Sequence, residues 1–226
     1  MKVASYNIRK AIGTDRARNP GRVIDVINAI EADVVVLQEA DRRLGQRPAA
    51  LPREMLEAHS DFAPVPLALN DVSLGWHGNA ILLRKDARFS APRRIDLPGF
   101  EPRGAVAVDL AGVTLVGVHL GLLRRHRHLQ LRALGAALGT GPTIIAGDFN
   151  EWSKRVGLEP FEGRFHMHSP GRSFHANRPM AALDKIGHSD GLNLHDAGVI
   201  ETRLARRASD HLPVWAKITP PAGAHG

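Results

Sequence analysis

The sequence predicts a layered α/β fold, and two observations carry that prediction. Short apolar runs of strand length recur along the 226 residues, and stretches with helical spacing of apolar residues lie between some of them. Hydrophobic residues make up 43% of the chain and charged residues 23%, which is typical of a globular protein rather than a disordered one. We therefore expect a single domain over residues 1–219, followed by a flexible tail at 220–226.

The predicted strands are apolar runs rich in aliphatic and β-branched side chains. In chain order they are Val3–Ile8, Val34–Gln38, Asn79–Leu83, Ala105–Leu110, Thr114–His119, Thr143–Gly147, Leu183–Gly187 and Leu212–Ile218. None approaches the roughly 18 apolar residues that a membrane-spanning helix requires, so we expect no transmembrane segment.

Two helices and three loops complete the predicted elements. Asn19 and Pro20 form a helix-start signature, and Val23, Ile27 and Ile30 follow at helical spacing. A second helix is predicted from about Leu122 to Leu138, with Leu131, Leu134 and Leu138 on one stripe. Stretches rich in proline and glycine are predicted as loops at Arg47–Pro52, Ala91–Arg103 and Gly163–Pro179.

The net charge indicates which kind of partner the protein binds, and the cysteine content bears on its cellular location. The formal net charge is +7, which favours a polyanionic partner such as nucleic acid or an anionic phospholipid. Basic residues gather within 124–132 and 203–207, where a solvated helix face and a phosphate-binding surface are equally plausible interpretations. The chain has no cysteine and no legible secretory signal, so we expect a cytoplasmic protein, and we expect a monomer.

Polar residues stand at the ends of many predicted strands, where an apolar core would not accommodate them. Strand ends of an α/β sheet point into one crevice, so residues far apart in sequence are expected to converge there. Carboxylates, amides and imidazoles in one buried cluster would require a metal ion or an anion to compensate them. The residues in question are Asn7, Glu39, His119, Asp148, Asn150, Asp184, Asp210 and His211.

Seven segments, in this order, resemble the signature blocks of the endonuclease/exonuclease/phosphatase superfamily, of which DNase I is a member. They are SYNIRK, VVVLQE, WHGNAILLR, VGVHLG, IIAGDFN, LDKI and SDHLPV, and the resemblance covers Met1 to about Ile218. The wording and arrangement of these motifs most resemble those of small bacterial members of the superfamily. The resemblance implies a four-layer α/β sandwich, in which two mixed β-sheets pack face to face with helices outside. It also implies phosphoester hydrolysis that depends on Mg²⁺ or Mn²⁺.

The resemblance assigns metal-side roles to three residues. Glu39 is the implied principal metal ligand, which is consistent with the preference of Mg²⁺ for carboxylate oxygen. Asn7 supplies an amide near the metal and the phosphate, and Asp210 is a second carboxylate on the metal side.

The implied catalytic residues are His211, Asp148, Asp184, His119 and Asn150. Asp148 orients or deprotonates the attacking water, and Asn150 holds a phosphoryl oxygen. His211 lies beside the phosphate as either a base or a cationic stabiliser, and Asp184 fixes its tautomer. His119 is either a phosphate contact or the acid that protonates the leaving group.

Phosphate contacts are further expected from Arg9, Arg103, Arg172 and Arg178. Two positions depart from better-known relatives. Arg9 stands where AP endonucleases carry an acidic metal ligand, which argues against abasic-site repair. Asn79 stands where DNase I carries the glutamate partner of the histidine at position 119, and an amide cannot relay a proton.

Three functions remain open from the sequence. The first is a metal-dependent phosphodiesterase that cleaves nucleic acid, which explains the basic surplus. The second is a phosphatase or phospholipase C-like hydrolase that acts on phospholipid headgroups or small phosphomonoesters. The third is a binding module that keeps the fold without catalysis.

Overall fold

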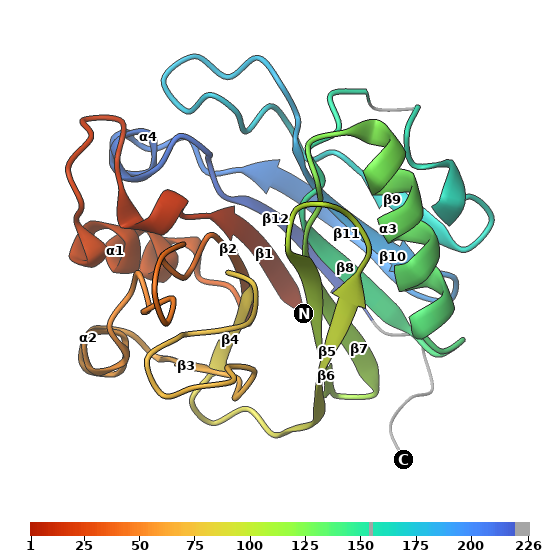
Figure 1. The fold of residues 1–226 in the computed structure, drawn as a ribbon, viewed down its shortest axis with the longest axis horizontal. Coiled ribbons are helices and arrows are strands. Elements are labelled where there is room, and N and C mark those ends of the chain that lie inside the picture. The colour runs from red at the N-terminus through yellow and green to blue at the C-terminus, as the bar shows by residue number, and fades with distance from the viewer. Residues whose placement is uncertain (154–155, 220–226) are drawn as a thin grey trace.

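Two six-stranded sheets form the centre of the molecule in a computed structural model that describes residues 1–153 and 156–219 (Figure 1). The first sheet has the order β11-β12-β1-β2-β4-β3, and the second has the order β5-β6-β7-β8-β10-β9. The first sheet contains β1 (Lys2–Asn7), β2 (Val34–Gln38), β3 (Phe62–Pro64), β4 (Ala80–Arg84), β11 (Asn193–Val199) and β12 (Val214–Thr219). The second contains β5 (Phe89–Leu97), β6 (Arg103–Leu110), β7 (Val113–His119), β8 (Thr143–Asp148), β9 (Phe165–His168) and β10 (Asp184–Ser189).

Each sheet is mixed in the same way. The pairs β1–β2 and β7–β8 are parallel, whereas the other pairs of neighbouring strands are antiparallel. Parallel neighbours end at the same edge of a sheet, so each sheet presents two adjacent carboxyl ends at one rim.

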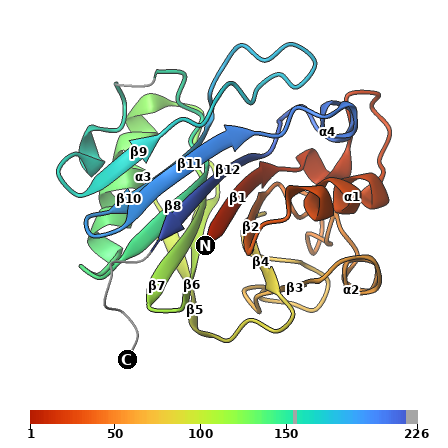
Figure 2. The same cartoon turned by 180° about the vertical axis from the view of Figure 1, so that it is seen from behind.

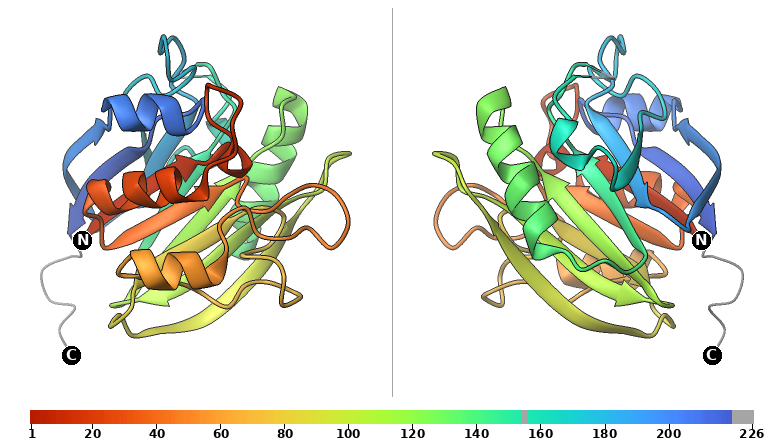
Figure 3. Two further views of the ribbon diagram at one scale, coloured as in Figure 1. Left: turned by 90° about the vertical axis from the view of Figure 1, so that its left-hand side faces the viewer. Right: turned by 90° about the vertical axis from the view of Figure 1, so that its right-hand side faces the viewer.

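Helices cover the outer faces of the two sheets. The helices α1 (Pro20–Ile30), α2 (Arg53–His59) and α4 (Arg203–Ala208) lie over the first sheet, and α3 (Arg124–Ala137) lies over the second (Figures 1 and 3). Short 3₁₀ turns occur at Arg9–Ala11 and Glu159–Phe161. The layers are therefore helix, sheet, sheet, helix, and the predicted four-layer sandwich is confirmed.

The buried apolar residues form three clusters, one for each contact between layers. The cluster between the sheets includes Val36, Val106 and Ile186. Gly117 lies at this contact, where an added Cβ would come within 2.7 Å of a methyl group of Val36, so the two sheets approach too closely there for any side chain. The other two clusters join α1 and α4 to the first sheet and α3 to the second.

The two predicted helices have the expected physical basis. The Asn19 side chain accepts a hydrogen bond from the backbone N–H of Arg22, and Pro20 opens the first turn of α1. Leu131 and Leu134 of α3 are buried against the second sheet, as their spacing predicts.

Two of the predicted loops are wrong in part because they contain strands. Residues 91–103 include most of β5, and residues 163–179 include β9. Both strands lie at sheet edges, where side chains are exposed and polar, so they lack the apolar run that marks a buried strand. The strands β3 and β11 and the helices α2 and α4 were also absent from the prediction, and β3 and β11 are likewise edge strands.

The tail predicted at 220–226 lies outside the described residues. Within the described ranges, no helix combines the length and the apolar character that crossing a bilayer demands.

Candidate active site

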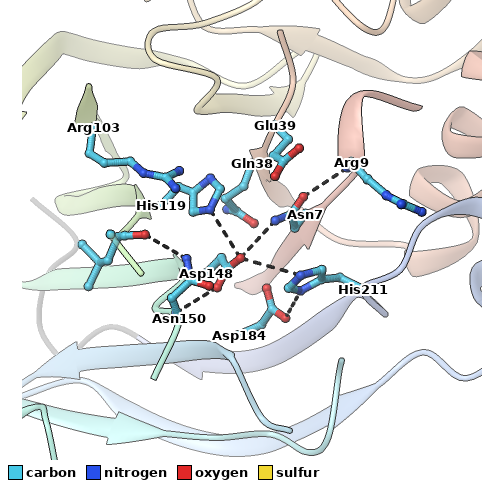
Figure 4. A network of polar contacts seen from close by, with 12 residues as sticks. Asn7, Arg9, Gln38, Glu39, Arg103, His119, Asp148, Asn150, Asp184 and His211 are labelled. Carbon is cyan, nitrogen blue, oxygen red and sulfur yellow. Dashed lines mark hydrogen bonds and ion pairs between the residues drawn. The ribbon is translucent and has the colours of Figure 1, made fainter. Parts of the chain in front are cut away.

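Strand ends from both sheets meet at one rim of the sandwich (Figure 4). In the first sheet, parallel β1 and β2 place Asn7 beside Glu39, the residue that follows β2. In the second sheet, His119 and Asp148 are register partners at the ends of parallel β7 and β8. Asp184, the first residue of β10, pairs with the same Asp148. The contact between the two sheets brings these residues together.

The carboxylate of Asp148 is the centre of a buried polar network. One oxygen accepts hydrogen bonds from the Asn7 side-chain amide at 3.0 Å, and the other accepts from the Asn150 backbone N–H at 2.9 Å. The Nε2 atoms of His119 and His211 lie 3.5 and 3.8 Å from the first oxygen. Asp148 is only 1% exposed, so these donors must compensate its charge in place of water.

His211 is oriented by a second buried carboxylate. Its Nδ1 lies 2.8 Å from Asp184 Oδ2, which also accepts a hydrogen bond from the Ser173 hydroxyl at 2.5 Å. Burial alone would lower the pKa of His211, but the carboxylates of Asp184 and Asp148 outweigh burial and raise it to about 9. With Nδ1 committed to Asp184, Nε2 is the ring nitrogen that faces Asp148.

His119 is in the opposite electrostatic situation. Burial lowers the pKa of its imidazole to about 3, and the nearby Asp148 carboxylate opposes this shift without reversing it. The ring is therefore neutral at physiological pH. A neutral imidazole donates one hydrogen bond but carries no positive charge.

Asn150 has the left-handed backbone conformation, with φ of 51°. Its side-chain amide donates a hydrogen bond to the carbonyl oxygen of Leu120 at 2.8 Å, next to His119. This bond ties the turn after β8 to the turn after β7, and it holds Asn150 at the rim.

Glu39 also has a left-handed backbone, with φ of 53°, in the turn that follows β2. Strained conformations of non-glycine residues are concentrated at functional sites. Its carboxylate contacts the ammonium group of Lys10 and lies 4.0 Å from the Arg43 guanidinium. Burial and the neighbouring Arg43 lower the pKa of Lys10 to about 8.

A cleft of about 340 Å³ opens beside Glu39 and His119. Four basic side chains line it, namely Lys10, Arg43, Arg47 and Arg103, together with three acidic ones, Glu39, Asp41 and Glu101. Lys10, Arg43 and Arg47 were not among the residues singled out from the sequence. Lys10 and Arg43 have one sequence signal, because they lie three and four residues after the candidate residues Asn7 and Glu39, whereas Arg47 has no such signal.

The remaining predicted residues are placed outside the Asp148 network. The Arg9 Nε atom lies 3.2 Å from Asp210 Oδ2, so these two residues pair with each other. Arg103 pairs with Glu101 at 2.7 Å on the wall of the cleft. Arg172 and Arg178 are exposed on the loop between β9 and β10 that carries Ser173.

The oxygen donors around Glu39 fit a hard divalent cation. The Glu39 side chain is 18% exposed at the cleft, which leaves room for the waters that Mg²⁺ retains. The Asn7 amide oxygen, which accepts a hydrogen bond from the Arg9 backbone N–H at 3.1 Å, lies at the same rim. Carboxylate and amide oxygens are the ligand types that such a cation prefers.

A second group with ligand atoms consists of Asp148, Asp184 and His211, whose nearest donor atoms all lie within 4.8 Å of one another. Here the Nδ1 of His211 is hydrogen-bonded to Asp184, and that bond fixes the ring against both carboxylates. This geometry suits a proton-holding pair more closely than an open coordination site.

Comparison with known proteins assigns the fold to a family. A model of the endonuclease/exonuclease/phosphatase family matches residues 4–211. The chain is 29% identical over 246 aligned positions to the uncharacterized protein YbhP of Escherichia coli K12, with 96% of each chain covered.

Solved structures agree with this assignment at the level of the fold. D. rerio TDP2 complexed with single strand DNA product superposes with a TM-score of 0.73 at 17% identity, covering 97% of this chain and 98% of that one. The mannosyl-6-phosphatase of Bacteroides thetaiotaomicron superposes with a TM-score of 0.71 at 19% identity, covering 97% and 99%. The chain therefore belongs to the endonuclease/exonuclease/phosphatase family, whose members hydrolyse phosphoesters.

Proposed function

We propose that this protein is a divalent-metal-dependent phosphodiesterase that hydrolyses nucleic acid. The observation that carries the proposal is the Asp148 carboxylate, which is buried between two imidazoles and two amide donors at the rim where both sheets end. A carboxylate held in this way is preorganised to receive a proton or to orient a water molecule.

His211 is proposed to stabilise negative charge on the phosphoryl group. Its imidazole, held by Asp184 and raised in pKa to about 9, carries a proton on Nε2 at neutral pH, and that proton is available to a phosphoryl oxygen. Between the two roles left open by the sequence, this supports the cationic stabiliser over the base.

His119 is proposed to contact phosphate rather than to protonate the leaving group. Since burial lowers its pKa to about 3, it is a neutral donor at physiological pH and a poor source of a full proton. The side chain of Asn79 supports this role, because its amide donates to the Gly104 carbonyl oxygen at 2.9 Å and offers no acidic group.

In the proposed reaction, a water molecule attacks the phosphorus atom in line with the leaving oxygen. One P–O bond forms to the water oxygen, the P–O bond to the leaving group breaks, and the water proton passes to Asp148. Glu39, with Asn7 and Asp210, is proposed to hold Mg²⁺ or Mn²⁺, which would neutralise charge on the phosphoryl group and the leaving oxygen.

A nucleic acid substrate is favoured by the basic side chains of the cleft. Lys10, Arg43, Arg47 and Arg103 lie beside Glu39, where they would meet phosphates flanking the one that is cleaved. The resemblance in fold to TDP2, whose structure contains a single-stranded DNA product, is consistent with this choice.

A phosphomonoesterase is the second candidate, and the size of the cleft favours it. A volume of about 340 Å³ is within the range of pockets that enclose small ligands. The resemblance in fold to a mannosyl-6-phosphatase is consistent with this alternative.

A substrate panel tests the proposal directly. Plasmid DNA, single-stranded DNA, mixed phospholipids and a phosphomonoester would be incubated with the protein and Mg²⁺ or Mn²⁺, with EDTA as the control. We expect cleavage of DNA that EDTA abolishes. Turnover of a lipid or a monoester with DNA untouched would replace the nuclease with the corresponding alternative, and inactivity on all substrates would favour a binding module.

A further inference from the structure

Three histidines share one face of the second sheet, away from the Asp148 network. His166 and His168 alternate along β9, and His188 of β10 is the register partner of His166. Phe165 and Met167, which alternate with the two histidines along β9, pack toward the core beneath α3, so the three imidazoles lie on the opposite face. Figure 2 shows β9 and β10 at this edge of the sheet.

Two of these imidazoles present their Nε2 atoms to each other. The Nε2 atoms of His168 and His188 are 3.2 Å apart, and the two rings are stacked, with an interplanar angle of 10° and centroids 5.2 Å apart. The His166 ring lies 5.1 Å from that of His188, and its own Nε2 is 2.8 Å from Asp190 Oδ1.

The hydrogen bonds define which nitrogen is free to bind a metal. His188 Nδ1 lies 3.1 Å from the carbonyl oxygen of Ser189, which only accepts hydrogen bonds, so Nδ1 carries the proton and Nε2 of the neutral ring is a lone-pair donor.

The separation of the two nitrogens matches a shared metal ion. Zinc binds imidazole nitrogen at about 2.0–2.1 Å, and two ligands of a tetrahedral ion are therefore about 3.3 Å apart. We propose that His168 and His188 bind a transition metal ion of the zinc class across β9 and β10, separately from the cation at Glu39.

A third ligand is available from the exposed side chains beside the pair. The His166 and Asp190 side chains are 61% and 82% exposed, so either can rotate toward the metal at little cost. Imidazole and carboxylate are both zinc ligands, and water completes the sphere.

The proposed histidine site is far from the Asp148 network along strand β10. Asp184 and His188 are four residues apart on β10, which is roughly 13 Å along a strand. Nitrogen ligands favour zinc, copper or nickel, whereas the oxygen donors around Glu39 favour magnesium or manganese. Metal bound at the histidines would join the edge strand β9 to β10 and stabilise the fold without taking part in hydrolysis.

Metal titration of the full chain tests this proposal without any substrate. EDTA-treated protein would be titrated with ZnCl₂ in excess Mg²⁺, using calorimetry, and with CoCl₂, using visible absorption to detect tetrahedral cobalt. The variants are His168→Ala, His188→Gln and Glu39→Ala, with His195→Ala as the matched control because His195 pairs with Thr219 on a different strand pair.

We expect one zinc equivalent in the wild type, Glu39→Ala and His195→Ala, and at least about tenfold weaker binding in His168→Ala and His188→Gln. Zinc should also raise the thermal unfolding midpoint of the wild type but not of His168→Ala. Should His188→Gln fail to fold by circular dichroism, His168→Ala alone decides, because His168 is half-buried at the sheet edge.

Three results would overturn the proposal. One is the absence of saturable binding to the wild type, which would leave a hydrogen bond between the two histidines. The others are equal affinity in His168→Ala and the wild type, and loss of the zinc equivalent in Glu39→Ala. None of these results depends on phosphoester turnover, so the proposed hydrolase activity can fail or hold independently.

Discussion

The charges of single side chains at the rim are set by their neighbours rather than by residue type. His211 and His119 face the same Asp148 oxygen, yet one has its pKa raised to about 9 and the other has it lowered to about 3. The largest charge effect that raises the pKa of His211 comes from Asp184, whose carboxylate is hydrogen-bonded to His211. Two imidazoles can therefore serve as a charged donor and a neutral donor in one site.

Replacement of Glu39 by alanine is expected to remove catalysis while the protein still folds. The carboxylate is partly exposed at the cleft, so its loss leaves no buried cavity, but it is the proposed metal ligand. We expect a rate loss on the order of 10²-fold or more. Steady-state rates with Mg²⁺ measure this, with Glu54→Gln on exposed α2 as the control. An unchanged rate would exclude Glu39 as the catalytic ligand.

Replacement of Asp184 by asparagine should disorient His211. The amide can donate to Nδ1 and so favour the wrong tautomer, as known for aspartate–histidine pairs in other hydrolases, and we expect a rate loss of roughly 10²-fold or more. Ser173→Ala, which removes the hydroxyl that donates to Asp184 but keeps the carboxylate, should cost less. Equal losses for the two variants would contradict an orienting role for the carboxylate.

The residue types at the rim were predictable, but their contacts were not. Asn7, Glu39, His119, Asp148, Asp184 and His211 were identified because polar residues interrupt apolar runs at strand ends. The pairing of Arg9 with Asp210 depends on how a turn after β1 meets the segment before β12, and no local pattern encodes that. Lys10, Arg43 and Arg47 of the cleft were missed for the same reason, whereas Arg103 was among the predicted residues.

At the scale of elements, the basic run at the start of α3 proves to be largely structural. Arg124 and Arg127 donate to the carboxylate of buried Glu151 at 2.8 and 2.6 Å. Arg127 also donates to the carbonyl oxygens of Gly121 and Leu122. These bonds fix the turn that connects β7 to α3, which supports Leu120 and through it Asn150. The sequence left open whether this basic run is a solvated helix face or a phosphate-binding surface. Arg124 and Arg127 instead make structural contacts within the protein.

Glu151 should make the stability of the fold sensitive to acid. Burial raises its pKa, but hydrogen bonds from Arg124, the Ser153 backbone and Arg127 outweigh burial and lower it to about 2, from 4.5 for a free side chain. The stabilisation is therefore complete above pH 4.5 and is lost as the pH falls toward 2; we expect a contribution of about 2–3 kcal/mol.

Urea unfolding of Glu151→Gln between pH 2 and 7 tests this. At pH 7 the variant should be destabilised, because it leaves the buried Arg127 without its charge partner, and its stability should change less with acid than that of the wild type. Glu162→Gln, at an exposed position, is the control. A parallel pH dependence in Glu151→Gln and the wild type would show that Glu151 is not the titrating group.

Central strands were predicted well because burial on both faces produces uninterrupted apolar runs, as in β2 and β8. Edge strands were missed because one ladder of hydrogen bonds and a polar surface leave no such pattern. β5 illustrates this: it contains Pro92, its register shifts between Ser90 and Arg93, and most of its residues are exposed.

For the whole molecule, the net charge of +7 bears on substrate recognition. If the substrate is nucleic acid, its affinity should fall as salt rises, because basic side chains release counterions from phosphates. Arg43→Ala and Arg47→Ala at the cleft should each reduce the slope of log affinity against log salt by about 1.

Binding of single-stranded DNA to Glu39→Ala, measured by fluorescence anisotropy over a series of salt concentrations, provides this slope. Arg88→Ala, an exposed position outside the cleft at Glu39, is the matched control and should leave the slope near that of the parent variant. Identical slopes for all four proteins would separate the cleft from DNA binding.

The chain enters the first sheet at β1, completes the second sheet between β5 and β10, and returns to the first with β11 and β12. All strands of the second sheet therefore lie in one continuous segment, residues 89–189. The first sheet, which carries Asn7 and Glu39, is built from strands that precede this segment and strands that follow it. Because β12 and the preceding His211 come late in the sequence, the candidate active site is complete only after almost all of the described chain has been synthesised.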